Sequence, residues 1–292
     1  MKVFAVIVCY SPDLGHLRET CDSLVRSNAE VILVDNSEQS YLSRTAQFPD
    51  CTLIVNGENF GIARAQNIGI RRAVESGAEV VVFFDQDSRI GPGLLASLLA
   101  PLKLGVPAVV APVSRDATKG FEYPPTRVTK HGMQEKVYAD DRVAPYEVDI
   151  VLSSGTAATV ETFERAGVMD EDLFIDFVDI EWCLRCRSRN IPIHVVPTAV
   201  IEHSVGSRSI DLRFATVLVH SPVRCYYQIR NCFRLFSRES VPLLLAIREA
   251  TLLVVHKSLL MLVMPNRGAY LRAYAEGLYD GLKGVTGTNP RN

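Results

Sequence analysis

An apolar run that ends in two carboxylates decides the fold: residues 80–87 are Val-Val-Val-Phe-Phe-Asp-Gln-Asp. A short continuous run of β-branched and aromatic residues is typical of a strand that is buried on both faces. Asp85 and Asp87 therefore stand one residue apart where this strand ends and the chain leaves the sheet. Acidic loops after strands are common, so the interpretation of this pair depends on the rest of the sequence.

Two more apolar strands precede this one, at residues 3–8 and 31–34, and amphipathic helices are predicted after each of them, at 14–27 and 62–76. Parallel strands need long crossover connections, which helices of this length supply. The alternation predicts the α/β fold class with a parallel sheet of the Rossmann kind. The chain has 292 residues, of which 48% are hydrophobic, so it can bury a full core.

Polar side chains follow each of the three strands. Tyr10 comes after the first strand, Asp35 after the second and Asp85 after the third. In parallel α/β sheets, ligands bind at the carboxyl ends of the strands. The sequence therefore predicts a nucleotide site at this edge of the sheet.

The pattern changes along the second half of the chain. Residues 108–150 are rich in Pro, Gly and charge, which predicts surface loops across the sheet. Helices are predicted at 160–167 and 177–188. We expect a catalytic domain at residues 1–205 and a helical extension at 206–292.

The helical extension is basic and apolar. From residue 206 onward it holds twelve Arg or Lys against five Asp or Glu, while the rest of the chain is acidic. Ser221-Pro222 is typical of a helix start. The positive charge predicts a partner that carries phosphates, either a diphosphate ligand or an anionic lipid surface.

Residues 241–264 are apolar enough to raise the question of a membrane span, but Arg248, Glu249, His256 and Lys257 interrupt them. Each charged residue in hydrocarbon costs roughly 2.5 to 3.5 kcal/mol, which argues against a span. Two interpretations stay open: a helix that lies in the membrane interface, and a helix that packs on the main domain.

The seven cysteines form no small-domain disulfide framework and fit a reducing compartment. Cys183 and Cys186 fall in a helical pattern, with no second pair at zinc spacing, and are expected to be core thiols. We expect a cytoplasmic protein that is peripheral on the inner face of the cell membrane.

Several segments in order along the chain resemble the family 2 glycosyltransferases. The most specific is Asn-Phe-Gly-Ile-Ala-Arg-Ala-Gln-Asn-Ile-Gly at 59–69, and the others are 35–37, 174–185, Glu202-His203 and 226–231. The greatest similarity is to bacterial rhamnosyltransferases that extend surface polysaccharides. The resemblance implies a GT-A nucleotide-binding sheet and transfer of a sugar from a nucleotide donor with inversion.

The resemblance also implies a donor site. It assigns Tyr10 and Asp35 to the base and ribose of the donor, and Asn59, Gly61 and Asn67 to the loop and helix start beside it. Independently of the family, a glycine at a strand-to-helix turn lets the backbone approach a ligand closely, and a helix start favours anionic groups. Simple capping of the helix by Asn59 and Gly61 is the alternative.

A metal site is implied in the same way. Asp85 would hold the donor near its ribose or the metal, Asp87 would ligate the metal directly, and His203 would complete the site. Two carboxylates and one imidazole suit Mg²⁺ or Mn²⁺ together with diphosphate oxygens.

Inverting transfer needs one base that takes the proton of the acceptor hydroxyl. The resemblance assigns this base to Asp179. Asp176 is the nearby rival, because a helix that begins near it would place both carboxylates on one face. The acceptor side is expected to include Gly155, Asp176, Glu181 and Trp182, with plain core packing as the alternative for Trp182.

Arg230 is expected to contact the donor diphosphate. A helical pattern places it on the same side as Asn231 and Arg234. A fixed guanidinium there would stabilise the negative charge that builds up on the leaving diphosphate.

The sequence thus predicts transfer of rhamnose from dTDP-rhamnose to a hydroxyl of a lipid-linked or polysaccharide acceptor, assisted by Mg²⁺ or Mn²⁺. A UDP-hexose or UDP-galactofuranose donor is the first alternative, since the motifs specify the diphosphate better than the sugar. A non-catalytic nucleotide-sugar-binding module is the second. No nucleic-acid-binding motif is recognised in the basic extension.

Overall fold

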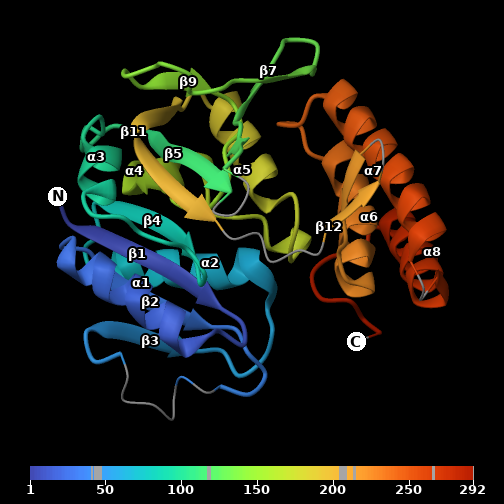
Figure 1. Ribbon diagram of the computed structural model, residues 1–292, viewed down its shortest axis with the longest axis horizontal. Coiled ribbons are helices and arrows are strands. Elements are labelled where there is room, and N and C mark those ends of the chain that lie inside the picture. The colour runs from blue at the N-terminus through green and yellow to red at the C-terminus, as the bar shows by residue number, and fades with distance from the viewer. Residues whose placement is uncertain are drawn as a thin grey trace.

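The computed structural model describes residues 1–40, 42, 48–116, 120–203, 209–212, 215–264 and 267–291, apart from the side chains of 203, 209–212, 215–218, 262 and 263. A central sheet with helices on both faces occupies one side of the molecule, and three helices lie beside it (Figure 1).

The first half of the sheet is parallel, as the sequence predicts. It contains β1 (Val3–Cys9), β2 (Glu30–Asp35), β3 (Cys51–Val55) and β4 (Val80–Asp85), in the order β3-β2-β1-β4. The three strands predicted from apolar runs are confirmed, and β3 was missed. Its residues are partly buried or exposed, and its apolar run, Leu-Ile-Val, is only three residues long.

The second half of the sheet is mixed, which corrects the prediction of a parallel sheet. It contains β10 (Ala157–Thr159), β5 (Val109–Asp116), β11 (Ile193–His203), β9 (Tyr146–Val148) and β6 (Glu122–Tyr123). The short strand β10 lies between β4 and β5 and is antiparallel to both. β11 pairs with β5 in parallel and with β9 in antiparallel. The stretch predicted as loops at 108–150 thus holds several strands, including the small hairpin of β7 (Thr126–Val128) and β8 (Gln134–Lys136).

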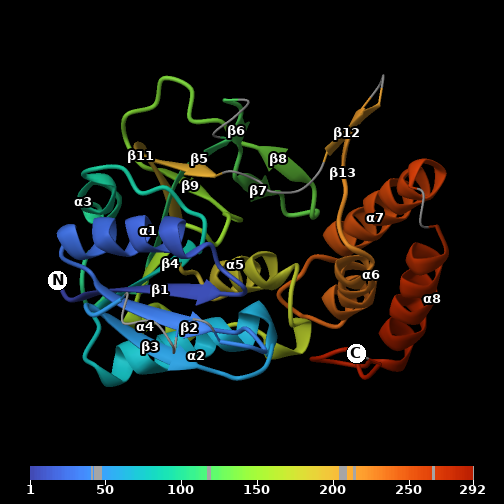
Figure 2. The ribbon, with the colours of Figure 1, turned by 60° about the horizontal axis from the view of Figure 1, so that its bottom comes forward.

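Helices cover both faces of the sheet (Figure 2). One layer contains α1 (Leu14–Arg26) and α3 (Leu94–Leu99), and the other contains α2 (Gly61–Glu75), α4 (Val160–Ala166) and α5 (Val178–Ser188). Because side chains alternate along a strand, Phe4 and Val6 pack under one layer while Ala5 and Ile7 pack under the other. The helices predicted for this region are confirmed within a residue or two at each end.

The helical extension follows a hairpin of β12 (Ser209–Leu212) and β13 (Ala215–Leu218), and it contains α6 (Pro222–Phe236), α7 (Leu243–Val263) and α8 (Arg267–Lys283). The predicted start of α6 is confirmed, since the Ser221 hydroxyl oxygen accepts the N–H of Arg224 at 3.2 Å. A Cβ atom at Gly277 of α8 would lie 2.7 Å from the carbonyl oxygen of Tyr226, so glycine is what lets α8 approach α6.

The boundary predicted at residue 205 falls within 204–208, outside the described residues. In the part of the chain that the structure describes, none of the helices has the length and apolar character needed to cross a membrane.

Candidate active site

A cavity of about 1280 Å³ lies where the carboxyl ends of the strands meet the helical extension. Its lining comes from the ends of β1, β2 and β4, from the loop before α2, from residues 174–180 and from α6 and α7. Cavities that bind one small ligand are usually about 300 to 1,000 Å³. This cavity is therefore large enough for a nucleotide sugar together with part of a second substrate.

Asn36 organises the end of the cavity between β2 and α2. Its side-chain oxygen accepts hydrogen bonds from Asn56 Nδ2 and the Phe60 N–H, both at 3.0 Å. Its Nδ2 donates to Asn59 Oδ1 at 2.9 Å, and that oxygen also accepts the Gly61 N–H at 3.0 Å. Asn36, Asn59 and Gly61 all line the cavity. Asn59 thus fixes the helix start, as the capping alternative predicted, and it also borders the cavity.

Tyr10 and Asp35 differ in their exposure. Tyr10 is 46% exposed and lines the cavity, and its N–H donates to Gln86 Oε1 at 2.7 Å, which ties the ends of β1 and β4 together. Asp35 is fully buried and is not in the cavity lining. Its carboxylate accepts the Ser37 N–H at 3.1 Å and a hydrogen bond from the Ser40 hydroxyl. In this structure Asp35 shapes the turn that presents Asn36.

Gly61 brings α2 against the loop that precedes α5. Its φ is +79°, and a Cβ atom there would lie 2.5 Å from the Phe174 carbonyl oxygen. The same oxygen accepts the Ile62 N–H at 2.7 Å. Only glycine combines this φ with this approach.

Two residues predicted at the site are buried away from the cavity lining. Asn67 is 2% exposed, and its amide exchanges two hydrogen bonds with the backbone of Met169, at 2.8 and 2.9 Å. Gly155 has a φ of +79°, and a Cβ atom there would lie 2.5 Å from Pro112 Cγ. Both positions support the walls of the cavity, and Gly155 orients the neighbouring Ser154, which does line it.

The two carboxylates after β4 are both exposed, but only Asp85 lines the cavity. The side chain of His203 is outside the described residues, although its backbone pairs with Asp116 across β5 and β11. Among the described side chains there is no cluster of three or more metal-binding groups. Asp85 and Asp87 still fit Mg²⁺ or Mn²⁺ as a donor set, because these ions accept carboxylate oxygens and complete their shell with substrate phosphates and water.

Asp179 lies in the first turn of α5, and its half-buried side chain lines the cavity. Burial raises the pKa of its carboxyl to about 6, because the charged form loses hydration. The nearby charges of Asp176 and Asp85 add to this effect, and a hydrogen bond from the Ile180 N–H at 2.9 Å opposes it. A carboxylate with a pKa near 6 is suited to act as a general base at neutral pH.

Asp176 also lines the cavity. It does not lie on α5, which corrects the prediction that one helix face carries both Asp176 and Asp179. Its φ is +63° and α5 begins only at Val178. Arg224 of α6 binds its carboxylate through Nε and an Nη atom, at 2.9 to 3.1 Å. This fork-like pairing holds Asp176 as an ion pair and leaves Asp179 as the better base.

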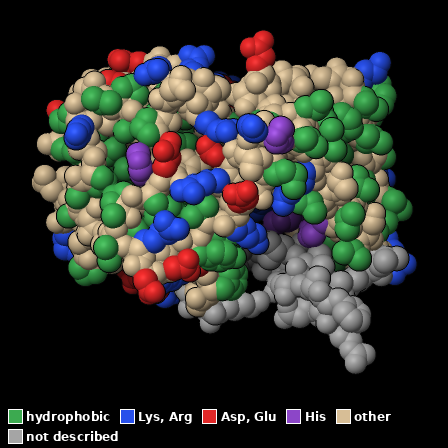
Figure 3. Space-filling model, turned by 90° about the horizontal axis from the view of Figure 1, so that it is seen from above, with side chains coloured by type: hydrophobic (Ala, Val, Ile, Leu, Met, Phe, Trp, Pro, Cys, Tyr) green, Lys and Arg blue, Asp and Glu red, His purple; other side chains and the backbone are tan. Residues whose placement is uncertain are grey.

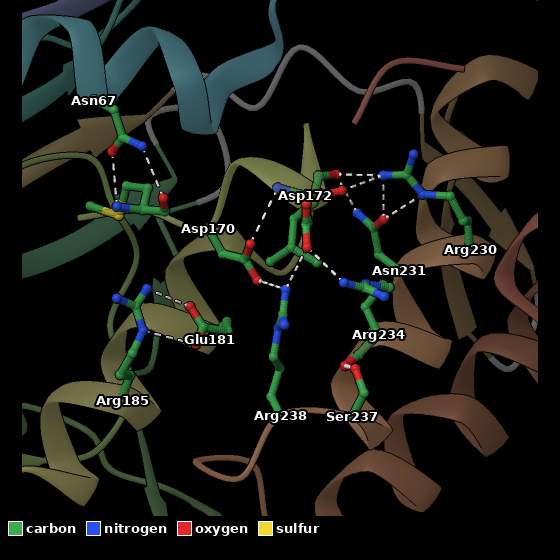
Figure 4. Close-up of polar contacts among 12 residues, drawn as sticks. Asn67, Asp170, Asp172, Glu181, Arg185, Arg230, Asn231, Arg234, Ser237 and Arg238 are labelled. Carbon is green, nitrogen blue, oxygen red and sulfur yellow. Dashed lines mark hydrogen bonds and ion pairs between the residues drawn. The ribbon is translucent and has the colours of Figure 1, made fainter. Parts of the chain in front are cut away.

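Glu181 and Trp182 are buried and are absent from the cavity lining, which corrects their predicted contact with the acceptor. The Glu181 carboxylate is paired with Arg185, and the Trp182 ring stacks on Phe163 with its Nε1 donating to the Gly167 carbonyl at 3.0 Å (Figure 4 shows the first pair). Glu181 lies two residues after Asp179, so it points to the other side of α5, about 200° away. Trp182 is held in the core by its contacts with Phe163 and Gly167.

Arg230 is another correction. Its side chain is fully buried and donates to the backbone carbonyls of Asp172, Leu173 and Gly287 instead of facing the cavity. Arg224, nearly two turns earlier in α6, is the arginine that lines the cavity. The helix start at Ser221-Pro222 places Arg224 in the first turn of a helix, but no motif in the sequence marks it as a site residue.

Comparison with known proteins agrees with this geometry. Residues 5–161 match the family model described as glycosyl transferase family 2. The chain is 39% identical over 287 residues to the dTDP-rhamnosyl transferase RfbF of Shigella flexneri, covering 98% of this chain and 97% of that protein. It is also 26% identical to the low-salt glycan biosynthesis hexosyltransferase Agl10 of Haloferax volcanii, over 59% of this chain and 57% of that protein.

Solved structures show the same fold at lower identity. S. aureus TarS 1-349 in complex with UDP-GlcNAc is 15% identical, with a TM-score of 0.55 over 98% of this chain and 82% of that one. GalNAc-T7 with UDP, GalNAc and Mn²⁺ is 16% identical, with a TM-score of 0.56 over 70% of this chain and 44% of that one. With its GT-A-like fold and a nucleotide-sized cavity at the expected edge of the sheet, this chain belongs to glycosyl transferase family 2 and is a glycosyltransferase.

Proposed function

We propose that the protein transfers rhamnose from dTDP-rhamnose, with inversion, to a hydroxyl of a lipid-linked or polysaccharide acceptor in the synthesis of a cell-surface glycan. The single observation that carries the inverting mechanism is Asp179, a carboxylate of raised pKa in a cavity where its rival Asp176 is paired with Arg224. The rhamnosyl donor is supported by the similarity to the Shigella flexneri protein.

In the transfer step, Asp179 accepts the proton of the acceptor hydroxyl as its oxygen bonds to the anomeric carbon, and the bond from that carbon to the diphosphate breaks. Tyr10, Asn36 and Asn59 border the end of the cavity that would receive the nucleotide. A Mg²⁺ or Mn²⁺ ion held by Asp85 and Asp87 would neutralise the charge on the leaving diphosphate. Arg224 keeps Asp176 in place beside the base.

A panel of nucleotide sugars tests the donor. A ligand that binds only the folded state raises the melting temperature by mass action. With Mn²⁺ present, dTDP-rhamnose should raise it more than UDP-glucose, UDP-galactofuranose or UDP-GlcNAc, and more than it does without the metal. A larger rise with a UDP-sugar would replace the proposed donor by that sugar.

We also propose that the helical extension lies on an anionic membrane surface. The charged side chains of α7 are paired or buried: Arg248 and Glu249 pair with each other and Lys257 is buried. Many of its apolar side chains are exposed, and α8 adds more of them (Figure 3, right-hand part). Outside the cavity lining they are Leu243, Leu244, Ile247, Val254, Val255, Leu259, Leu271, Leu278, Tyr279 and Leu282, each exposed by 36% or more. Exposed basic residues, Arg267, Arg272 and Lys283, accompany this apolar face.

Vesicle flotation tests this arrangement. The protein should float with anionic vesicles, less with neutral ones, and less again at high salt because salt screens the charges. Val254→Glu should reduce flotation, since Val254 is 66% exposed on α7. Val143→Glu is the matched control, because Val143 is 80% exposed but lies in the loop before β9. Equal flotation of the two variants would contradict the proposed face, and equal flotation on both vesicle types would contradict the role of charge.

A further inference from the structure

The loop that leads into α5 has an unusual backbone. Phe174, Asp176 and Phe177 have φ angles of +64°, +63° and +64°, so three non-glycine residues out of four are left-handed. Each such residue costs on the order of 1–3 kcal/mol and persists only where the surroundings hold it. The loop carries Asp176 and ends two residues before Asp179, so what holds it also sets the position of the base.

Asn231 of α6 is a main part of that support. It is fully buried, and its Nδ2 donates to the carbonyls of Leu173 and Ile175, both at 2.7 Å, with that of Asp176 at 3.3 Å. An amide nitrogen carries two hydrogens, so the two short bonds use its full donor capacity. Both bonds go to backbone atoms inside the left-handed stretch or next to it.

Arg230 holds the same loop one step upstream. One Nη atom donates to the carbonyls of Asp172 and Leu173, both at 3.0 Å. The guanidinium also donates to Asn231 Oδ1, at 2.7 and 2.9 Å, which fixes the orientation of the Asn231 amide (Figure 4). The sequence neighbours Arg230 and Asn231 thus form one hydrogen-bonded unit that spans the backbone from residue 172 to 176.

The opposite side of the loop is held by packing. The Phe174 ring stacks on Tyr227 of α6, with the ring centroids 4.4 Å apart and the planes 10° apart. The Phe174 carbonyl is bound by the start of α2 through the Ile62 N–H. These contacts anchor Phe174 itself, whereas Asn231 is the residue whose side chain reaches the carbonyls of Ile175 and Asp176.

We propose that Asn231, oriented by Arg230, is a positioning residue for sugar transfer. Its amide stabilises the left-handed backbone of residues 174–177 and thereby aims Asp176 and Asp179 into the cavity. The inference rests on the proposed role of Asp179 as the base. It gives the helical extension a part in the chemical step that is separate from any contact with lipid.

Asn231→Ala should lower kcat while leaving the donor affinity unchanged, because the donor end of the cavity is built from other elements. A displacement of the base by about 1 Å can lower turnover roughly 100-fold. Turnover with the donor found in the panel, donor affinity by calorimetry and melting temperature are measured together. Asn231→Ser keeps one donor and should have an intermediate kcat, and it decides the matter if the alanine variant does not fold.

A second substitution tests the backbone argument directly. Glycine adopts a positive φ without strain, so Phe177→Gly should restore kcat about tenfold in the Asn231→Ala protein while giving no such gain alone. Leu235→Ala on the same helix is the matched control, since it removes a fully buried side chain that is absent from the cavity lining. It should lower the melting temperature and leave kcat unchanged.

Normal kcat in Asn231→Ala or Asn231→Ser would overturn the positioning role. A loss of kcat no larger than that of Leu235→Ala at the same loss of stability would overturn it too. Failure of the glycine rescue would overturn the backbone explanation. Turnover of Asp179→Asn distinguishes a failure of the positioning role from a failure of the proposed function. Normal turnover of that variant would contradict the role of Asp179 as the base, whereas normal turnover of the Asn231 variants would contradict only the positioning role.

Discussion

Asp179→Asn should lower turnover by roughly 100 to 10,000-fold, the usual range for the loss of a general base, and leave donor affinity unchanged. The amide keeps the shape of the side chain and can still accept the Ile180 N–H, but it cannot take a proton from the acceptor hydroxyl. Turnover and donor affinity of the variant are measured with the same acceptor as for the unmodified protein.

Asp176→Asn is the control for this prediction and should have a milder effect, because the Asp176 carboxylate is already bound by Arg224. Near-normal turnover in the Asp179 variant with collapse in the Asp176 variant would assign the base to Asp176.

The pH dependence follows from the same carboxyl. Since burial raises the pKa of Asp179 to about 6, kcat/KM should fall as the pH drops below about 6, where the base becomes protonated. The raised pKa means that the charged form of Asp179 is disfavoured in the folded protein. The carboxylate therefore lowers the free energy of unfolding fully above about pH 6, and it has no such effect below about pH 4, the ordinary pKa of an Asp in the unfolded chain. Asp179→Asn should therefore raise the melting temperature at pH 8, and the gain should vanish towards pH 4.

Asp85→Ala should abolish most of the metal-dependent donor binding, and Asp87→Ala should act in the same direction. A bound ion supplies several kcal/mol of charge stabilisation, which corresponds to a loss of about 100-fold or more in affinity. Both carboxylates are exposed, so the fold should survive. Donor titrations by calorimetry, with and without Mn²⁺, measure the effect.

Asp22→Ala removes an exposed carboxylate from α1 and serves as the control, with no change expected in either titration. Nucleotide affinity that stays the same in the presence of Mn²⁺ for both the Asp85 and Asp87 variants would rule out the proposed metal site.

The elements that the sequence predicts best are those with a continuous apolar run or a recognisable helix cap. The runs that became β1, β2 and β4 are buried on both faces, and the start of α6 carries its own cap at Ser221. Strands such as β10 and β6 have three and two residues. Such short strands have no period to detect, and their pairing depends on partners far along the chain.

The sequence predicted some of the residues that line the cavity and missed others. Tyr10, Asp85 and Asp179 were found because strand ends and a family motif indicate them. The prediction for Arg230 is wrong because a helical pattern gives the relative directions of side chains but not which direction faces another element. Residues 174–177 contain no glycine, which is the usual sequence sign of a left-handed backbone. The sequence therefore gives no signal for the proposed role of Asn231.

The place of β10 in the sheet has a consequence for how the protein is made. β10 lies between β4 and β5 in space but follows β5 in the chain. During synthesis β1 to β4 can therefore pair as soon as they emerge, whereas β5 has to wait for β10 before it can join them. Until then the edges of β4 and β5 are unpaired, and such edges are templates for pairing with other chains. The half of the sheet that contains β1 to β4 can thus assemble first, and the interval before β10 arrives is when a nascent chain is most exposed to aggregation.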